Sequence, residues 1–167
     1  MQVTVCLVDW PEITFREQSG LLPDDFWDVG LEEGWIEAPP SWRNDSSIFY
    51  REVREAWGKV RHELSAENRD RTGSSFDLVF GYDPPYELEY SMDYWFLAVS
   101  PDTVSSMSEN ISELDLSNIQ QVFEANYLEL ELDIADCQDE LLPYLLQWKA
   151  AFDTAKRMRW GLLCHQG

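Results

Sequence analysis

The strongest constraint on the fold is a boundary in the middle of the chain, at residues 94–102. Residues 94–99 form a continuous apolar run, whose length is typical of a buried central strand. Ser100 then offers a helix N-cap, Pro101 suits the first helical position and Asp102 suits the first turn. This boundary predicts a domain in which a buried strand leads directly into a helix.

Five other segments have strand-like patterns. Residues 2–8 alternate and are rich in Val, and residues 76–82 and 86–90 are separated by a Pro-rich turn. Residues 160–164 add a final strand. Residues 127–134 alternate strictly between apolar and acidic side chains, which indicates either an edge strand or the approach to the last helix.

The clearest helix is predicted over residues 47–65. Its apolar side chains recur at spacings of three and four residues and form one stripe: Phe49, Val53, Ala56, Trp57, Val60 and Leu64. A polar loop is predicted at residues 68–75, which follow this helix.

Other helices are predicted on both sides of it. A short one begins at Pro23 and ends at Gly30 or Gly34. Two more follow the central boundary, one through Ile111 and one that begins near Asp115 or Ser117. The last helix, at residues 137–159, is bent or preceded by a break at Pro143.

Together these segments predict an α/β (α+β) fold. We expect one compact domain over residues 1–167, with a mixed or antiparallel sheet of about four to six strands and about three or four packed helices. The eight Trp, eight Phe and seven Tyr supply a core and argue against disorder. Residues 9–45 are rich in Pro and Trp, and the pattern there specifies little beyond the short helix.

The second half of the chain resembles a known family. The resemblance covers residues 94–163: an apolar strand, the capped helix after Ser100, an acidic helix that ends at Glu124, and a last helix closed by Gly161, Leu162 and Leu163. This arrangement resembles the YfbM-like family of uncharacterised bacterial proteins. The resemblance implies a small cytoplasmic α/β bacterial protein and assigns no functional residue.

Charge is the most pronounced feature of the composition. The chain has 12 Lys and Arg against 32 Asp and Glu, a formal net charge of −20. The 77 residues from Thr72 to Trp148 contain no Lys or Arg and sixteen acids. Such a field repels nucleic acid and anionic membranes and attracts basic surfaces, although acidity can also serve solubility alone.

Other features of the sequence indicate the cellular compartment. The N-terminus has no basic leader, and no apolar run reaches the length of a membrane span. Three Cys at widely spaced positions (Cys6, Cys137, Cys164) fit reduced thiols better than a disulfide framework. These features predict a cytoplasmic protein.

The residues that could carry catalysis or bind a metal all fit ordinary structural roles. We expect His62 to be a helix-surface residue, and Cys164 and His165 to be end-of-chain residues rather than a nucleophilic pair. The acids at Asp133, Asp136, Asp139 and Glu140 lack calcium-loop spacing, and no phosphate-binding or dinucleotide motif occurs. No catalytic residue, metal ligand or cofactor is therefore predicted.

One pattern does indicate binding. Acids alternate with aromatic residues at positions 83–95, and acids recur at positions 129–140, which combines electrostatic steering with aromatic anchors. The same pattern also fits a hairpin with Tyr inside and Glu outside. The predicted partner-binding residues are Asp83, Tyr86, Glu87, Glu89, Tyr90, Asp93, Glu129, Glu131, Asp133, Asp136, Asp139 and Glu140.

These features favour a function in protein binding. The leading hypothesis is an acidic inhibitor of a basic partner, such as an immunity protein that neutralises a basic toxin, with no direct contact to nucleic acid or membrane. A nucleic-acid mimic that occupies a DNA-binding protein is a related hypothesis. An enzyme of unrecognised type and a housekeeping α/β domain without catalytic role are the alternatives from other classes.

Overall fold

Four strands form one antiparallel sheet in the order β2-β1-β4-β3 in the computed structural model, which describes residues 3–40, 42, 50–72, 76–81, 83–89 and 95–166. The strands are β1 (Val3–Val8), β2 (Ile36–Glu37), β3 (Trp95–Val99) and β4 (Gly161–Gln166). The two central strands pair along their whole length, from Val3 opposite Gln166 to Val8 opposite Gly161. The sheet takes the antiparallel form of the mixed or antiparallel sheet that was expected, and the first and last strands of the described chain form its centre.

Eight α-helices surround this sheet in the described part of the chain. They are α1 (Trp10–Gln18), α2 (Phe26–Glu33), α3 (Tyr50–Val60), α4 (Ala66–Thr72), α5 (Phe76–Phe80), α6 (Pro101–Ser112), α7 (Leu116–Asn126) and α8 (Leu141–Met158). A 3₁₀ turn (Arg61–Glu63) continues α3, and a π-helical segment (Asp136–Glu140) precedes α8. The domain is therefore α+β, as predicted, with more helices than the three or four expected.

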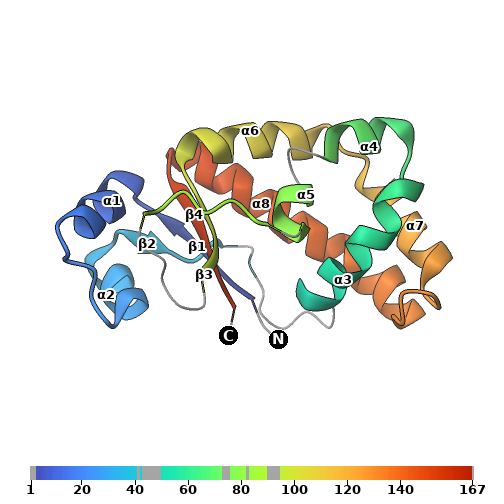
Figure 1. Cartoon of the computed structure of the whole chain (residues 1–167), viewed down its shortest axis with the longest axis horizontal. Helices are drawn as coiled ribbons and strands as arrows, with labels where there is room; N and C mark the ends of the chain where they lie inside the picture. The colour runs from blue at the N-terminus through green and yellow to red at the C-terminus, as the bar shows by residue number, and fades with distance from the viewer. Residues whose placement is uncertain are drawn as a thin grey trace.

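The sheet separates two hydrophobic clusters, because successive side chains of a strand point to opposite faces. Val5, Leu7 and Cys164 face the larger cluster, together with α3 and α5 to α8. Cys6 and Leu163 face a smaller cluster with α1 and α2. In Figure 1 these two helices lie at one end of the molecule and the larger group of helices at the other. Burial on both faces explains why the central strands are mostly apolar, except for the half-buried Thr4, His165 and Gln166 near one end.

The apolar stripe predicted for residues 47–65 is confirmed on α3 and its 3₁₀ continuation. Its members Val53, Ala56, Trp57, Val60 and Leu64 are all buried. Residues 47–49, with Phe49, lie outside the described part. Helices α6 and α7 begin as predicted, since the side chains of Ser100 and Asp115 accept hydrogen bonds from backbone N–H groups in their first turns.

The prediction of a strand at residues 76–82 is wrong. The structure has the five-residue helix α5 there, whose Phe76, Val79 and Phe80 are buried on one side. A short apolar run fits a buried strand and one helical turn equally well, so the pattern alone could not separate them. Tyr82 lies outside the described residues.

Two further predictions along this part of the chain need correction. The polar loop expected at 68–75 is in part helix α4, which continues to Thr72, while residues 73–75 are not described. Asn68 is buried there and exchanges hydrogen bonds with the backbone of Asp115. The strand expected at 86–90 is reduced to a single parallel bridge between Tyr86 and Ala98 at the edge of β3. Tertiary contacts, which the local pattern does not contain, decide both segments.

Residues 127–134 lead into the last helix and form no strand, which settles the choice that the sequence left open. The chain turns after α7 with Glu131 at a φ of 57°, and the π-helical segment follows. Helix α8 then runs to Met158, and Arg159 closes it in the left-handed conformation. The irregularity expected near Pro143 is therefore the π-helical segment just before it.

Two helices in residues 9–40 begin or end at residue types that commonly cap helices. Helix α1 begins with Asp9, whose carboxylate accepts a hydrogen bond from the backbone N–H of Glu12, and Pro11 lies in its first turn. Helix α2 ends at Gly34 with a φ of 78°, one of the two ends predicted.

Among the described residues, every helix is too short or too polar to cross a membrane.

Candidate functional site

The connection between α7 and α8 presents acids on a tight turn. Leu130 is buried beneath it, and its backbone N–H donates to the carbonyl of Asn126. The carboxylate of Asp133 accepts from the backbone N–H of Ala135, 2.8 Å away, at the start of the helical segment. This anchoring turns most of the predicted acids outward: Glu129, Glu131, Asp133 and Asp139 are exposed, and Asp136 and Glu140 are half-buried.

An apolar side chain stands among these acids. Leu128 is 74% exposed, more than any other large hydrophobic residue in the described part of the chain. An exposed apolar side chain that is followed in the chain by exposed acids has the composition of a small binding surface, with a dry centre and a polar rim. We call Leu128 and the acids from Glu129 to Glu140 the acidic turn.

The second predicted acidic segment, at residues 83–95, is partly structural. Asp83 and Glu89 are exposed, and Tyr86 is half-buried against the smaller cluster. The Glu87 carboxylate accepts from the backbone N–H of Ser100 at 2.6 Å and from the hydroxyl of Thr103 at 2.9 Å. Glu87 thus caps α6. Tyr90 and Asp93 lie outside the described residues.

The structure does not bring the two acidic segments together. Glu87 lies at the start of α6, on the side of the sheet, whereas the acidic turn lies beyond α7 at the far end of the molecule (Figure 1). A single small interface cannot include both.

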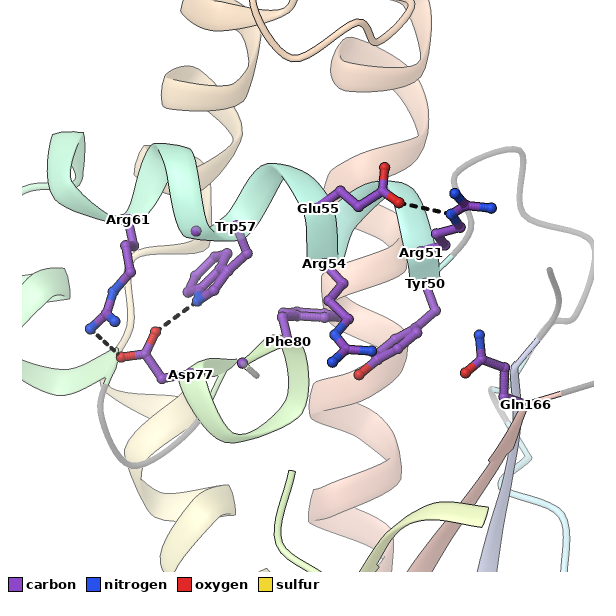
Figure 2. A pocket seen from close by; sticks show the side chains of 11 residues that line it. Tyr50, Arg51, Arg54, Glu55, Trp57, Arg61, Asp77, Phe80 and Gln166 are labelled. Atoms are coloured by element: carbon purple, nitrogen blue, oxygen red, sulfur yellow. Dashed lines mark hydrogen bonds and ion pairs between the residues drawn. The ribbon is translucent and has the colours of Figure 1, made fainter. Parts of the chain in front are cut away.

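A cavity of about 640 Å³ lies between α3, α5 and the end of β4, and sequence analysis missed it (Figure 2). Its lining consists of three arginines, two acids, three aromatic residues, two glycines and one amide: Arg51, Arg54, Arg61, Glu55, Asp77, Tyr50, Trp57, Phe80, Gly58, Gly81 and Gln166. A signal was available, because positions 51, 54, 58 and 61 are spaced by three and four residues and share one helix face.

Hydrogen bonds and ion pairs fix the base of this cavity. The Asp77 carboxylate accepts from the indole N–H of Trp57 at 2.7 Å and pairs with Arg61 at 2.6 Å. The Tyr50 hydroxyl donates to the carbonyl of Val79 at 2.6 Å. Burial raises the pKa of Tyr50, and the nearby Arg54 opposes this shift in part. Asp77 and Tyr50 are therefore engaged in holding α3 against α5.

A smaller cavity, of about 460 Å³, lies on the other side of the sheet. Acids and aromatic rings from α2 and the sheet line it: Asp24, Asp25, Asp28, Phe26, Trp27, Trp95, Thr4 and His165. The rings of Trp95 and His165 lie 5.3 Å apart, and burial lowers the pKa of His165. This imidazole is thus held largely neutral at pH 7.

The histidines and cysteines do not form a nucleophilic site in the described structure. His62 is exposed in the 3₁₀ turn, as predicted. Cys164 faces the larger cluster and His165 packs on Trp95, so the two neighbours point to opposite sides of β4. Burial raises the pKa of all three thiols, that of Cys137 to about 11. Such thiols are poor nucleophiles at neutral pH.

Within the part of the chain that the structure describes, no three His, Cys, Asp or Glu side chains are grouped as metal ligands would be. Comparisons with protein-family models, with curated proteins and with solved structures returned no match. The resemblance of residues 94–163 to the YfbM-like family therefore stays a prediction.

Proposed function

We propose that the protein is an acidic, cytoplasmic inhibitor that binds a basic protein, and that it acts as an immunity protein against a basic toxin. The observation that carries this proposal is the acidic turn, where Leu128 is 74% exposed among exposed acids. The acids would steer the partner by long-range attraction, and Leu128 would anchor it once docked.

The charge of the whole chain supports this assignment. Toxins that cleave nucleic acids are basic because their substrate is a polyanion, so a chain with a net charge of −20 is suited to meet them. The acidic turn also lies within the 77 residues that contain no Lys or Arg. A nucleic-acid mimic would use the same field, and DNA would then compete with the protein for its partner.

The test is the binding kinetics of the toxin encoded next to this gene. Association should be fast at an ionic strength of about 0.01 M and slow markedly at about 0.15 M, where the Debye length is only about 8 Å. The double variant Glu129→Lys/Glu131→Lys should slow association roughly tenfold. Leu128→Ala should instead speed dissociation roughly tenfold, as loss of a contact worth about 1.4 kcal/mol would.

Matched controls separate the site from net charge. Glu32→Lys/Glu37→Lys makes the same charge change on exposed residues at the α2 end of the molecule and should slow association much less. Leu21→Ala removes another exposed leucine and should leave dissociation unchanged. Equal effects of both double variants, or recovery of only acidic or neutral partners from the host, would contradict the proposal and favour a housekeeping domain.

The cavity lined by arginines gives the enzyme alternative a specific location. An enzyme should show a concave pocket in which polar groups converge, and this cavity has that form. Because Asp77 and Tyr50 are engaged in structural hydrogen bonds, we expect no turnover of generic ester, phosphoester or glycoside substrates, with or without added divalent metal. Turnover that Arg54→Gln or Asp77→Asn abolishes would establish an enzyme instead.

A further inference from the structure

The arginines of the large cavity are unusual in this chain. Only 12 of its residues are Lys or Arg, yet three of them line this one cavity. They face two carboxylates there, those of Glu55 and Asp77, so the described lining has an excess of positive charge in a molecule of net charge −20. A cavity of opposite sign to the molecule indicates a ligand that the rest of the surface would repel.

Arg51 can be redirected toward a ligand at little cost. Arg51 pairs with Glu55 at 2.8 Å, but both side chains are 64% exposed, and such surface pairs contribute little. Arg54 extends from the same helix toward Tyr50 (Figure 2). Arg61 is held by Asp77 instead. In Figure 2 the Arg54 guanidinium lies beside the Tyr50 ring and the Arg51 guanidinium lies beside Glu55, while Arg61 and Asp77 lie at the opposite end of the lining.

Gly58 provides an independent indication. It lies within α3, where glycine costs about 1 kcal/mol relative to alanine. A Cβ added at this position would meet nothing within 4 Å, so close packing does not require glycine. By contrast, a Cβ at Gly81 would lie 2.0 Å from the carbonyl oxygen of Asp77, so glycine is needed there. The absent side chain at position 58 keeps the cavity open between Arg54 and Arg61.

We propose that this cavity binds a small organic anion through a phosphate or carboxylate group. Arg51 and Arg54 would hold the oxyanion, because a planar guanidinium donates two parallel hydrogen bonds to either group. The volume of about 640 Å³ is in the range of ligand pockets and is larger than a bare phosphate needs. The remainder of the ligand would lie over the apolar base formed by Tyr50, Trp57 and Phe80.

The experiment uses four probes and the intact protein. Titration with phenyl phosphate, benzoate, inorganic phosphate and neutral benzyl alcohol is followed by calorimetry and by amide chemical shifts. Phenyl phosphate or benzoate should bind saturably and shift amides of α3 and α5. The tighter of these two should bind at least tenfold more tightly than benzyl alcohol and more tightly than inorganic phosphate. Whichever of phenyl phosphate and benzoate has the higher affinity shows whether the site prefers a phosphate or a carboxylate group.

Matched variants locate the site on α3. Arg51→Gln and Arg54→Gln should each weaken binding of the tighter probe at least tenfold, since each removes a charge-assisted contact. Lys59→Gln changes the net charge equally on the same helix, outside the cavity, and should change binding less than twofold. Gly58→Ala should retain binding, Gly58→Gln should weaken it, and Gly58→Glu should weaken it further by repulsion.

Each contrary result overturns the proposal. The first is that neither phenyl phosphate nor benzoate binds saturably. The second is that benzyl alcohol binds as tightly as the organic anions. The third is that Arg51→Gln and Arg54→Gln leave binding unchanged while circular dichroism shows that both variants are folded. Binding of inorganic phosphate as tight as that of the organic anions would overturn the role of the apolar base. None of these results depends on whether a basic protein binds the acidic turn.

Discussion

Trp57 contributes to the stability of the molecule through both packing and a polar contact. It is 1% exposed, packs against Phe76 and Phe80, and donates its indole N–H to Asp77. Trp57→Ala should therefore reduce the free energy of unfolding by about 3–5 kcal/mol.

His62, five residues further along the chain, is the natural control. Its side chain is exposed, so His62→Ala should change the free energy of unfolding by no more than about 0.5 kcal/mol. Urea denaturation of both variants measures the difference. A larger loss for His62→Ala than for Trp57→Ala would mean that α3 presents its other face to the core.

The three buried thiols make stability depend on alkaline pH. Burial raises the pKa of Cys137 to about 11 and raises the pKa values of Cys6 and Cys164 well above the ordinary value, whereas an unfolded thiol titrates near pH 8.5. The unfolded state therefore loses protons first as the pH rises. Their contribution to stability is complete below about pH 8.5 and declines above it, toward a slope of about 1.4 kcal/mol per thiol per pH unit.

Urea denaturation between about pH 8 and pH 10 measures this slope. The variant Cys6→Ala removes one thiol, and only its slope needs comparison, because the loss of packing changes stability equally at every pH. A slope that is the same in the variant and the native chain would contradict the assignment to the thiols.

At the scale of elements, α6 depends on a side chain from a distant segment. Ser100 caps its first turn locally, but Glu87, thirteen residues earlier, accepts from the Ser100 backbone and from Thr103. Glu87→Gln keeps the shape and removes the charge at a helix N-terminus, so it should reduce the free energy of unfolding by about 1 kcal/mol.

Glu89→Gln makes the same chemical change two residues away at an exposed position and should be nearly neutral. Thermal unfolding of the two variants provides the comparison. Equal losses of unfolding free energy in the two variants would mean that the removal of any charge from this segment lowers stability, and that the contact of Glu87 with α6 is not the cause. Charge reversal at Glu87 would test folding as much as binding, so the binding test uses the acidic turn.

At the scale of the whole molecule, the excess of negative charge opposes compactness. Among the described residues, ion pairs such as Lys156 with Glu109 and Arg16 with Glu12 engage some acids, but a net charge of −20 remains. Raising the ionic strength from about 0.01 M to about 0.15 M should therefore raise the midpoint of urea unfolding, because repulsion is screened.

The control for this prediction is the variant Glu32→Lys/Glu37→Lys, whose net charge is less negative by four. It should respond less to salt than the native chain does. A midpoint that falls with added salt would show instead that attractive pairs dominate the electrostatics of the fold.

Much of the candidate site depends on contacts between distant segments. The surface position of the acids at residues 129–140 could be predicted from sequence, since a charged run beside a helix end is usually solvated. The role of Glu87 could not be predicted, because its partner is Ser100 in another element. The cavity depends on α5 lying against α3, and the pattern of residues 76–82 had indicated a strand.

The sequence by itself determined the elements whose signals are local. The apolar run before Ser100, the stripe that includes Trp57, and the caps of α6 and α7 all depend on residues within a few positions of one another, where propensity and periodicity act. Tertiary structure alone decided whether residues 66–72 and 76–80 are helix and which strands are neighbours. These outcomes depend on packing between segments far apart in the chain, such as Phe80 against Trp148 and β1 against β4. The free energy of those contacts outweighs local preference where the local pattern is short or ambiguous.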